Sequence, residues 1–338
     1  FPPEILSQLL GDDADALSAK DHLGLSNVRY TLHLVYGRDD LLRDGDFIAD
    51  RTLPAFGEAG FRAGGLQGDG LPVIDVFSGD FSAAMDAGAG VAGLEAARVA
   101  ALRGYTVDVY EKADKIGGQI HLAAVPPRKD EIRRAVGYFE CILPALGVNI
   151  HLNTEATVEI MNAADAVIVA VGAHDFLLPV PGAEGANVVS SWDVLAGKAA
   201  VSGHCAVIGG GLVGTETAEY LLEKGCTVSI IEMMDKIANG ESSTILPTIM
   251  ADFKAHNVQQ YVNTKVSAIE AGTVKAIQGE EEITIPCDMV VMAVGSRKNV
   301  FNVDGVTVPV YYAGDCSGER TAGIMEAIRS GYRAANEI

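Results

Sequence analysis

Short apolar runs alternate along the chain with longer helix-like stretches that end at glycine. Residues 205–208 form such a run, the stretch up to about Lys224 favours a helix that stops at Gly225, and Thr227–Ile231 favours the next strand. Strands that alternate with helices are typical of a parallel sheet. The pattern therefore predicts an α/β fold.

The same pattern occurs twice. Residues 88–116, GAGVAGLEAARVAALRGYTVDVYEKADKI, align without a gap with residues 209–237, GGGLVGTETAEYLLEKGCTVSIIEMMDKI, at a constant offset of 121. A second pair of segments follows, AVIVAVG ending at Gly172 and MVVMAVG ending at Gly295. A repeat of this size indicates two related domains.

Each copy places the pattern GxGxxG between a strand and a helix. In the second copy, Gly209 makes a tight turn, Gly211 lets the backbone approach a pyrophosphate, and Gly214 allows the helix to pack on the sheet. Glu232 ends the next strand, where an acid hydrogen-bonds an adenosine ribose. A lone pattern of this kind is also typical of an ordinary glycine turn. The complete set, found twice, predicts two dinucleotide sites.

The first copy has the same order of elements and one departure from it. Its helix is expected over Leu94–Arg103 and its second strand over Thr106–Tyr110, directly before Glu111. Its first strand, expected over residues 81–87, contains Asp86, an unusual residue in a buried parallel strand. This departure weakens the prediction of where the strand starts and is the feature that favours a non-catalytic nucleotide-binding scaffold over an enzyme.

Composition and charge narrow the class of protein. The 338 residues are 49% hydrophobic and carry a net charge of −20, which excludes nucleic-acid and anionic-membrane partners. The longest apolar run, near Ala166–Ala173, is too short to span a bilayer. The five cysteines form no CxxC pair, so we expect neither disulfides nor a zinc site, and a reducing, cytoplasmic compartment.

Other enzyme classes lack their motifs. The sequence contains no GxSxG, no Walker A sequence and no HExxH, and its histidines show no metal-ligand spacing. Hydrolase, kinase and metalloprotease functions therefore have no support. The chain starts with Phe1 and not Met, which indicates a processed, trimmed or partial polypeptide.

Several motifs together carry a family resemblance. The first repeat followed by GGQ at 117–119, the two AVG strand ends and YYAGDC at 311–316 resemble the flavoproteins with two dinucleotide-binding domains. The resemblance implies FAD in the first domain and NAD(P)H in an inserted second domain. It also implies that Asp315 contacts the flavin end of FAD and that a helix over Thr321–Asn336 closes over the isoalloxazine.

A narrower resemblance covers residues 87–338. LEAARVAALRG, YEKADKIGGQ and GDCSGERTAGIMEAIRSGYRAANEI are similar to the C-terminal half of the 2-enoate reductase and 2,4-dienoyl-CoA reductase group, kin to old yellow enzyme. In that group an N-terminal barrel carries FMN, and a cysteine cluster holds a 4Fe-4S centre. Residues 1–86 are shorter than the roughly 200 residues of such a barrel and contain no cysteine. FMN and 4Fe-4S are therefore expected only if a barrel precedes this chain.

The expected architecture is two Rossmann-like three-layer domains, the second inserted in the first, after a small N-terminal segment. We assign 1–79 to that segment, whose role is unknown, with a helix at 3–10 and strands at 28–36 and 71–77. The FAD domain is expected over 80–197 and 296–338, and the NAD(P)H domain over 198–295. The crossings are expected at 190–202 and 296–306.

The glycine pattern and the resemblance nominate cofactor-binding residues. Those for FAD are Gly88, Gly90, Ala92, Gly93, Glu111, Lys112, Gly118, Gln119, Arg128, Ala170, Gly172, Gly314 and Asp315. Those for the nicotinamide nucleotide are Gly209, Gly211, Leu212, Val213, Gly214, Glu232, Ala293 and Gly295. No catalytic side chain or metal ligand is nominated, because the cofactors carry this chemistry.

Some side chains have two interpretations. Arg128 and Lys129 meet a pyrophosphate or simply begin a helix, and His121 faces the cofactor or the surface. Cys316 lies near the flavin or is a small packing residue, whereas Cys141 is expected in the core of an amphipathic helix over 131–146.

Glu232 bears on the choice of nucleotide. Met233 and Met234 follow it, and no cation stands beside it to hold a ribose 2′-phosphate. A carboxylate suits a free 2′-hydroxyl, so we expect NADH in preference to NADPH.

Three functions are compatible with these features. The first is an FAD-dependent oxidoreductase that accepts hydride from NADH and passes electrons to a downstream domain or subunit, the reductase half of an enoate reductase-type enzyme. The second is a free-standing NADH:acceptor reductase serving a carrier protein or quinone. The third is a non-catalytic, nucleotide-binding scaffold, as in relatives that hold only ADP. We expect an oligomer.

Overall fold

The computed structural model describes residues 42–43, 46–47, 83–318 and 323–338. The chain divides into two units, residues 1–81 with 101–105 and residues 82–100 with 106–338. In the first unit, β1 (Leu42–Arg43) pairs antiparallel with β2 (Asp46–Phe47). The elements expected at 3–10, 28–36 and 71–77 lie outside the described residues.

The second unit contains a parallel five-stranded sheet in the order β17-β6-β3-β4-β5. Its strands are β3 (Ala83–Ala87), β4 (Thr106–Tyr110), β5 (Asn149–His151), β6 (Ala166–Val169) and β17 (Val310–Tyr312). The strand with Asp86 does form, because its backbone pairs on both sides, with β4 and with β6. The central position of β3 places the first glycine loop in the middle of the sheet edge.

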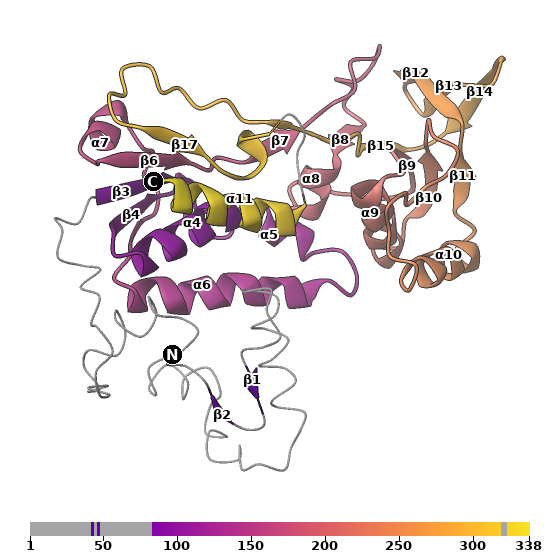
Figure 1. The fold of residues 1–338 in the computed structure, drawn as a ribbon. Helices are drawn as coiled ribbons and strands as arrows, with labels where there is room; N and C mark the ends of the chain where they lie inside the picture. Colours follow the sequence, from indigo (N-terminus) through magenta and orange to yellow (C-terminus); the bar gives the residue numbers. More distant parts are fainter. Residues whose placement is uncertain (1–41, 44–45, 48–82, 319–322) are drawn as a thin grey trace. The chain divides into compact units, whose positions relative to one another are not determined.

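Helices connect and cover this first sheet (Figure 1). They are α4 (Val91–Leu102), α5 (Ile120–Ala123), α6 (Arg134–Ala145), α7 (Val158–Asn162) and α11 (Ile324–Glu337), with 3-10 turns η3 (Asp130–Arg133) and η4 (Gly314–Cys316). Helix α11 packs closely on α4, since a Cβ at Gly331 would lie 2.0 Å from the carbonyl oxygen of Ala92. The helix is expected over Thr321–Asn336, and residues 321–322 of that range lie outside the described part of the chain.

A second parallel sheet has the order β11-β10-β9-β15-β8. Its strands are β8 (Val188–Ser190), β9 (His204–Ile208), β10 (Thr227–Ile231), β11 (Gln259–Tyr261) and β15 (Met289–Met292). Its helices are α8 (Ser191–Leu195), α9 (Leu212–Glu223) and α10 (Leu246–Ala255). An antiparallel sheet adds β12 (Thr264–Glu270), β13 (Thr273–Gln278) and β14 (Glu281–Pro286).

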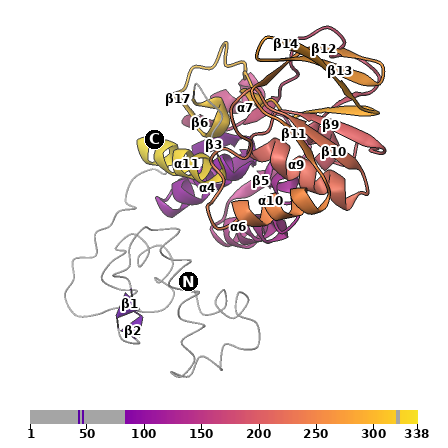
Figure 2. The same ribbon diagram turned by 90° about the vertical axis from the view of Figure 1, so that its right-hand side faces the viewer.

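The strands of the second sheet bury both faces. Cys205 and Val207 pack with α8, α9 and α10, whereas Ala206 and Ile208 pack with the antiparallel sheet. Figure 2 shows this antiparallel sheet and the helices on opposite sides of β9 and β10. This half of the unit therefore has three layers, which explains why its strands read as continuous apolar runs.

The chain crosses between the two parallel sheets at β7 (Ala173–Asp175) and β16 (Ser296–Lys298), which pair antiparallel. The second crossing begins at the expected residue 296. The expectation of a first crossing at 190–202 is wrong, because β8 already belongs to the second sheet through its pairing with β15. Strand β8 is only three residues long, too short for its sequence pattern to show that it is a strand of the second sheet.

The expectation that Cys141 lies in the core is also wrong. Its helix buries Val136, Phe139, Ile142 and Leu143, at the three- and four-residue spacing of one helix face. Cys141 falls on the opposite face and is exposed. In the described part of the chain, no helix is long and apolar enough to cross a membrane.

Candidate functional site

The first glycine loop leads from β3 into α4. Gly88 has a φ of +118°, and a Cβ there would lie 2.6 Å from the carbonyl oxygen of Ala170, so the turn requires glycine. At Gly90 a Cβ would meet no atom within 4 Å. The loop is therefore tight at its base and open at the position where a ligand's backbone contact is expected.

The second loop repeats this geometry between β9 and α9. Gly209 has a φ of +100° and the same close approach, 2.4 Å to the carbonyl oxygen of Ala293. Gly211 faces open space, and a Cβ at Gly214 would lie 1.8 Å from the carbonyl oxygen of Gly209. Glycine is therefore required for a different reason at each position: the tight turn at Gly209, the open space at Gly211 and the close packing at Gly214. These are the roles of the three glycines in a dinucleotide-binding turn.

The acid that follows each loop is bound in the same way in both copies. Glu111 accepts hydrogen bonds from the N–H groups of Ala89 and Ala113, both at 2.8 Å. Glu232 accepts them from Gly210 and Met234, both at 2.7 Å. Each carboxylate oxygen keeps a second lone pair that can accept a ribose hydroxyl. The backbone bonds fix each side chain at the mouth of its loop.

Both loops open on one cavity of about 1310 Å³. This volume exceeds the roughly 300–1,000 Å³ that is typical of a site for one drug-sized ligand. Of the residues nominated from the sequence, all but three line it: Gly88, Gly90, Ala92, Glu111, Lys112, Gly118, Gln119, Ala170, Gly172, Gly314, Asp315, Gly209, Gly211, Leu212, Val213, Glu232, Ala293 and Gly295.

The three exceptions lie on helices or in a loop. Gly93 is inside α4, and Gly214 packs on its own turn. Arg128 forms an ion pair with Glu219 of α9, and the adjacent Lys129 pairs with Glu216. Both cations of this loop thus contact carboxylates of the second half of the unit.

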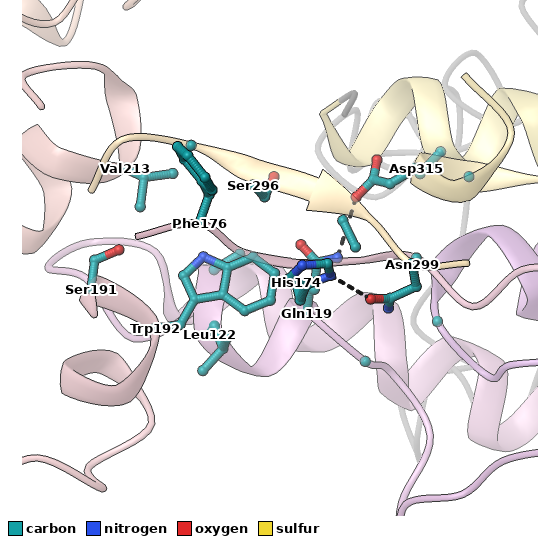
Figure 3. Close-up of a pocket in the computed structure, with 18 of the residues that line it drawn as sticks. Gln119, Leu122, His174, Phe176, Ser191, Trp192, Val213, Ser296, Asn299 and Asp315 are labelled. Carbon is teal, nitrogen blue, oxygen red and sulfur yellow. Dashed lines mark hydrogen bonds between the residues drawn. The ribbon is translucent and has the colours of Figure 1, made fainter. Parts of the chain in front are cut away.

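The GGQ turn meets the late Gly-Asp pair inside the cavity. Gln119 donates a hydrogen bond from Nε2 to Oδ2 of Asp315 at 3.2 Å (Figure 3). The N–H of Gly314 donates to Oγ of Ser330 on α11 at 2.6 Å. These bonds hold Asp315 between the turn and the C-terminal helix. His121 donates a hydrogen bond from Nε2 to the carbonyl oxygen of Ile116, at 2.7 Å.

Sequence reasoning missed the residues that the crossings bring to the cavity. His174 of β7 is hydrogen-bonded through Nδ1 to Oδ1 of Asn299 at 2.8 Å, and Asn299 donates to the carbonyl of Val171 at 2.7 Å. Phe176 and Trp192 also line the cavity, from the first crossing and α8 (Figure 3). These residues belong to no motif, so only the fold reveals them.

The cysteines show no reactive arrangement. All five lie in the described part of the chain and are free thiols. Cys316 is buried and donates to the carbonyl oxygens of Val169 and Ala313, and burial raises its pKa. Burial raises the pKa of Cys205 to about 12 and also raises that of Cys287. A thiol held protonated is a poor nucleophile.

Among the described residues, no group of three or more histidine, cysteine, aspartate or glutamate side chains is placed to hold a metal ion. The open cradles at Gly90 and Gly211, each at the start of a helix with free N–H groups, fit the pyrophosphate of a dinucleotide. Fold and site together define an α/β protein with two dinucleotide-binding loops on one cavity, the arrangement of a nucleotide-dependent oxidoreductase.

Comparison with known proteins identifies the family. The family model described as "Pyridine nucleotide-disulphide oxidoreductase" matches residues 87–331. The chain therefore belongs to this oxidoreductase family, whose members bind FAD and a pyridine nucleotide.

Individual relatives point the same way. A bilirubin reductase of Mediterraneibacter gnavus is 46% identical over 256 residues, which cover 74% of this chain and 40% of that protein. A cinnamate reductase of Clostridium sporogenes is 36% identical, over 74% of this chain and 38% of its own length. A 2-naphthoyl-CoA reductase structure superposes with a TM-score of 0.71 at 28% identity, covering 77% of this chain and 40% of that one. The chain spans about two-fifths of the length of these relatives.

Proposed function

We propose that the chain is the electron-input half of an enoate reductase-type enzyme. It accepts hydride from NADH on FAD and passes electrons to an acceptor domain or subunit. The observation that carries the proposal is the duplicated loop, with its glycines and fixed glutamate, opening twice on one cavity. The names of the bilirubin reductase and the cinnamate reductase support a role in the reduction of an organic substrate.

The domain assignment is part of this proposal. The first sheet, built from residues after 80 and from 296–338, would hold FAD, and the second sheet would hold the nicotinamide nucleotide. The membership of β8 in the second sheet favours a boundary between β7 and β8, earlier than residue 197.

Several residues would hold the flavin nucleotide. The start of α4 offers backbone N–H groups to the pyrophosphate, Glu111 faces the adenosine ribose, and Gln119 and Asp315 lie at the opposite end. When bound, FAD would supply the redox chemistry: it would accept a hydride, two electrons and a proton, from NADH, which would leave as NAD⁺.

The chain's own residues orient and shield this exchange. The Gln119–Asp315 hydrogen bond fixes the Asp315 carboxylate on the cavity wall, where it would contact the flavin end of FAD. The apolar side chains of Leu122, Phe176 and Trp192 line the cavity between the two loops and reduce water access. No side chain is required to move a proton.

The preference for NADH rests on Glu232. Its carboxylate is fixed at the loop mouth, where it accepts a 2′-hydroxyl and repels a 2′-phosphate. Met233 and Met234 beside it are exposed and uncharged. Lys265 of β12 lines the same cavity and is the cation that would oppose this preference.

The experiment is an anaerobic visible spectrum of the purified chain, followed by titration with NADH and with NADPH. We expect the absorption of oxidised flavin, bleached by NADH at lower concentration than by NADPH. A colourless protein that stays colourless with added FAD would overturn the proposal and leave the nucleotide scaffold. If NADH and NADPH bleach the flavin equally well, the preference for NADH is wrong but the rest of the proposal stands. Reduced protein that reoxidises with a quinone or small carrier would favour a free-standing acceptor reductase.

A further inference from the structure

Helix α9 carries two carboxylates that are removed from water. The side chain of Glu219 is 4% exposed and that of Glu216 is 13% exposed. Burial raises the pKa of both, and further acids face them: Asp252 of α10 faces Glu219, and Glu241, before α10, faces Glu216. Buried carboxylates that also repel one another require cations within reach.

Both cations come from a loop in the half of the unit that contains the first sheet. Arg128 pairs with Glu219 and Lys129 with Glu216, from the loop between α5 and η3. Arg128 adopts a φ of +65°, a left-handed conformation that is uncommon for residues other than glycine. Such backbone strain persists only where surrounding contacts hold it. The loop is therefore shaped to bring two adjacent cations to α9.

We infer that Arg128, Lys129, Glu216 and Glu219 form a clasp that fixes the second sheet against the first, so that Arg128 and Lys129 act as positioning residues for the reaction. The four residues connect elements that the chain otherwise joins at β7 and β16. Exposed ion pairs contribute little, but here the loss of a cation leaves a carboxylate buried and unpaired.

The clasp controls the cavity in two ways. It sets the distance between the two glycine loops, on which any transfer between bound nucleotides depends. It also neutralises Glu216, which lines the cavity one turn inside α9, near the helix start that is expected to hold a pyrophosphate. The effect on hydride transfer rests on the proposed function, whereas the clasp itself does not.

The chain contains a built-in reporter. Trp192 is its single tryptophan, and it lines the cavity from α8, near Leu122 of α5 in the half that contains the first sheet (Figure 3). If the two halves separate, water reaches this indole. Its emission then shifts to the red, and acrylamide quenches it more.

The test compares Arg128→Gln/Lys129→Gln with Arg133→Gln/Arg134→Gln in the full chain. The control also removes two positive charges, a few residues away, where Arg134 at the start of α6 pairs with the exposed Glu131 of η3. A second clasp variant, Glu216→Gln/Glu219→Gln, breaks the pairs without leaving a buried charge. Far-UV circular dichroism establishes that each variant is folded.

We expect red-shifted, more quenchable Trp192 emission in both clasp variants and wild-type emission in the control. With NADH, the limiting rate of flavin bleaching should fall more than the apparent affinity. Wild-type emission and quenching in Glu216→Gln/Glu219→Gln would overturn the clasp, and this variant decides alone if Arg128→Gln/Lys129→Gln does not fold. A wild-type protein that NADH does not bleach would instead overturn the proposed function, and the fluorescence would still decide the clasp.

Discussion

At the scale of single residues, the duplication supplies a matched pair of glutamates. Glu111 and Glu232 accept the same two kinds of backbone N–H group, but they stand at different loops. We predict that Glu232→Gln lowers the ratio of kcat/KM for NADH over NADPH by about tenfold, because an amide neither repels a 2′-phosphate nor makes a charged hydrogen bond of about 1.5–3 kcal/mol to the 2′-hydroxyl. Steady-state kinetics with both nucleotides measures this ratio.

Glu111→Gln serves as the control for that measurement. It changes the equivalent acid of the first loop, so it should weaken FAD retention and leave the ratio between the two nicotinamide nucleotides unchanged. An unchanged ratio in Glu232→Gln would show that another residue sets the preference, and Lys265 on the cavity wall is a candidate.

The cysteines give a second prediction at this scale. Cys141 is exposed, whereas Cys205, Cys226, Cys287 and Cys316 are buried. Labelling of the native protein with a thiol reagent should therefore modify one cysteine rapidly and the other four only after unfolding. Cys141→Ser should abolish the rapid reaction. Rapid labelling of another thiol in that variant would contradict the burial of the labelled cysteine.

At the scale of elements, the turn into α9 separates ligand contact from packing. A Cβ at Gly211 would meet no atom within 4 Å, whereas one at Gly214 would overlap the carbonyl of Gly209. We predict that Gly211→Ala keeps the wild-type unfolding midpoint but binds NADH more weakly, because the methyl group fills the space for the pyrophosphate. Gly214→Ala should lose about 1–3 kcal/mol of stability, as in overpacked cores.

Urea unfolding and NADH titration of both variants check this difference. If Gly211→Ala and Gly214→Ala lose equal stability, both glycines are needed for packing. Unchanged NADH affinity in Gly211→Ala would show that the nucleotide does not approach this part of the backbone.

Elements with a strong repeating pattern were predictable from the sequence. The strands at 106–110 and 227–231 have the expected bounds, and α9 ends one residue before the expected Lys224. What the sequence did not reveal depends on contacts between distant segments. Strand β8 is too short to show a period, Trp192 and His174 belong to no motif, and the partner of Arg128 lies 91 residues away in the sequence.

At the scale of the whole molecule, the clasp links stability to pH. Burial raises the pKa of Glu216 and Glu219 in the folded protein, so the folded state holds protons that the unfolded state has released. Stability should therefore fall as the pH rises from the ordinary glutamate pKa through the raised values. Glu219→Gln removes one of these groups and should flatten that decline, which urea unfolding across the pH range would show.

The two sides of one ion pair should then behave unequally. Arg128 is 52% exposed and can be solvated without its partner, so at neutral pH Glu219→Gln should be as stable as the wild type or more stable. Arg128→Gln leaves a buried carboxylate unpaired and should cost about 1–3 kcal/mol. That cost should shrink as the pH falls and Glu219 takes up a proton, whereas Arg134→Gln should cost little at any pH. Equal losses from Glu219→Gln and Arg128→Gln would instead mean that the ion pair adds net stability to the folded protein. These unfolding measurements report the free energy of unfolding, whereas Trp192 emission reports whether the clasp fixes the two halves.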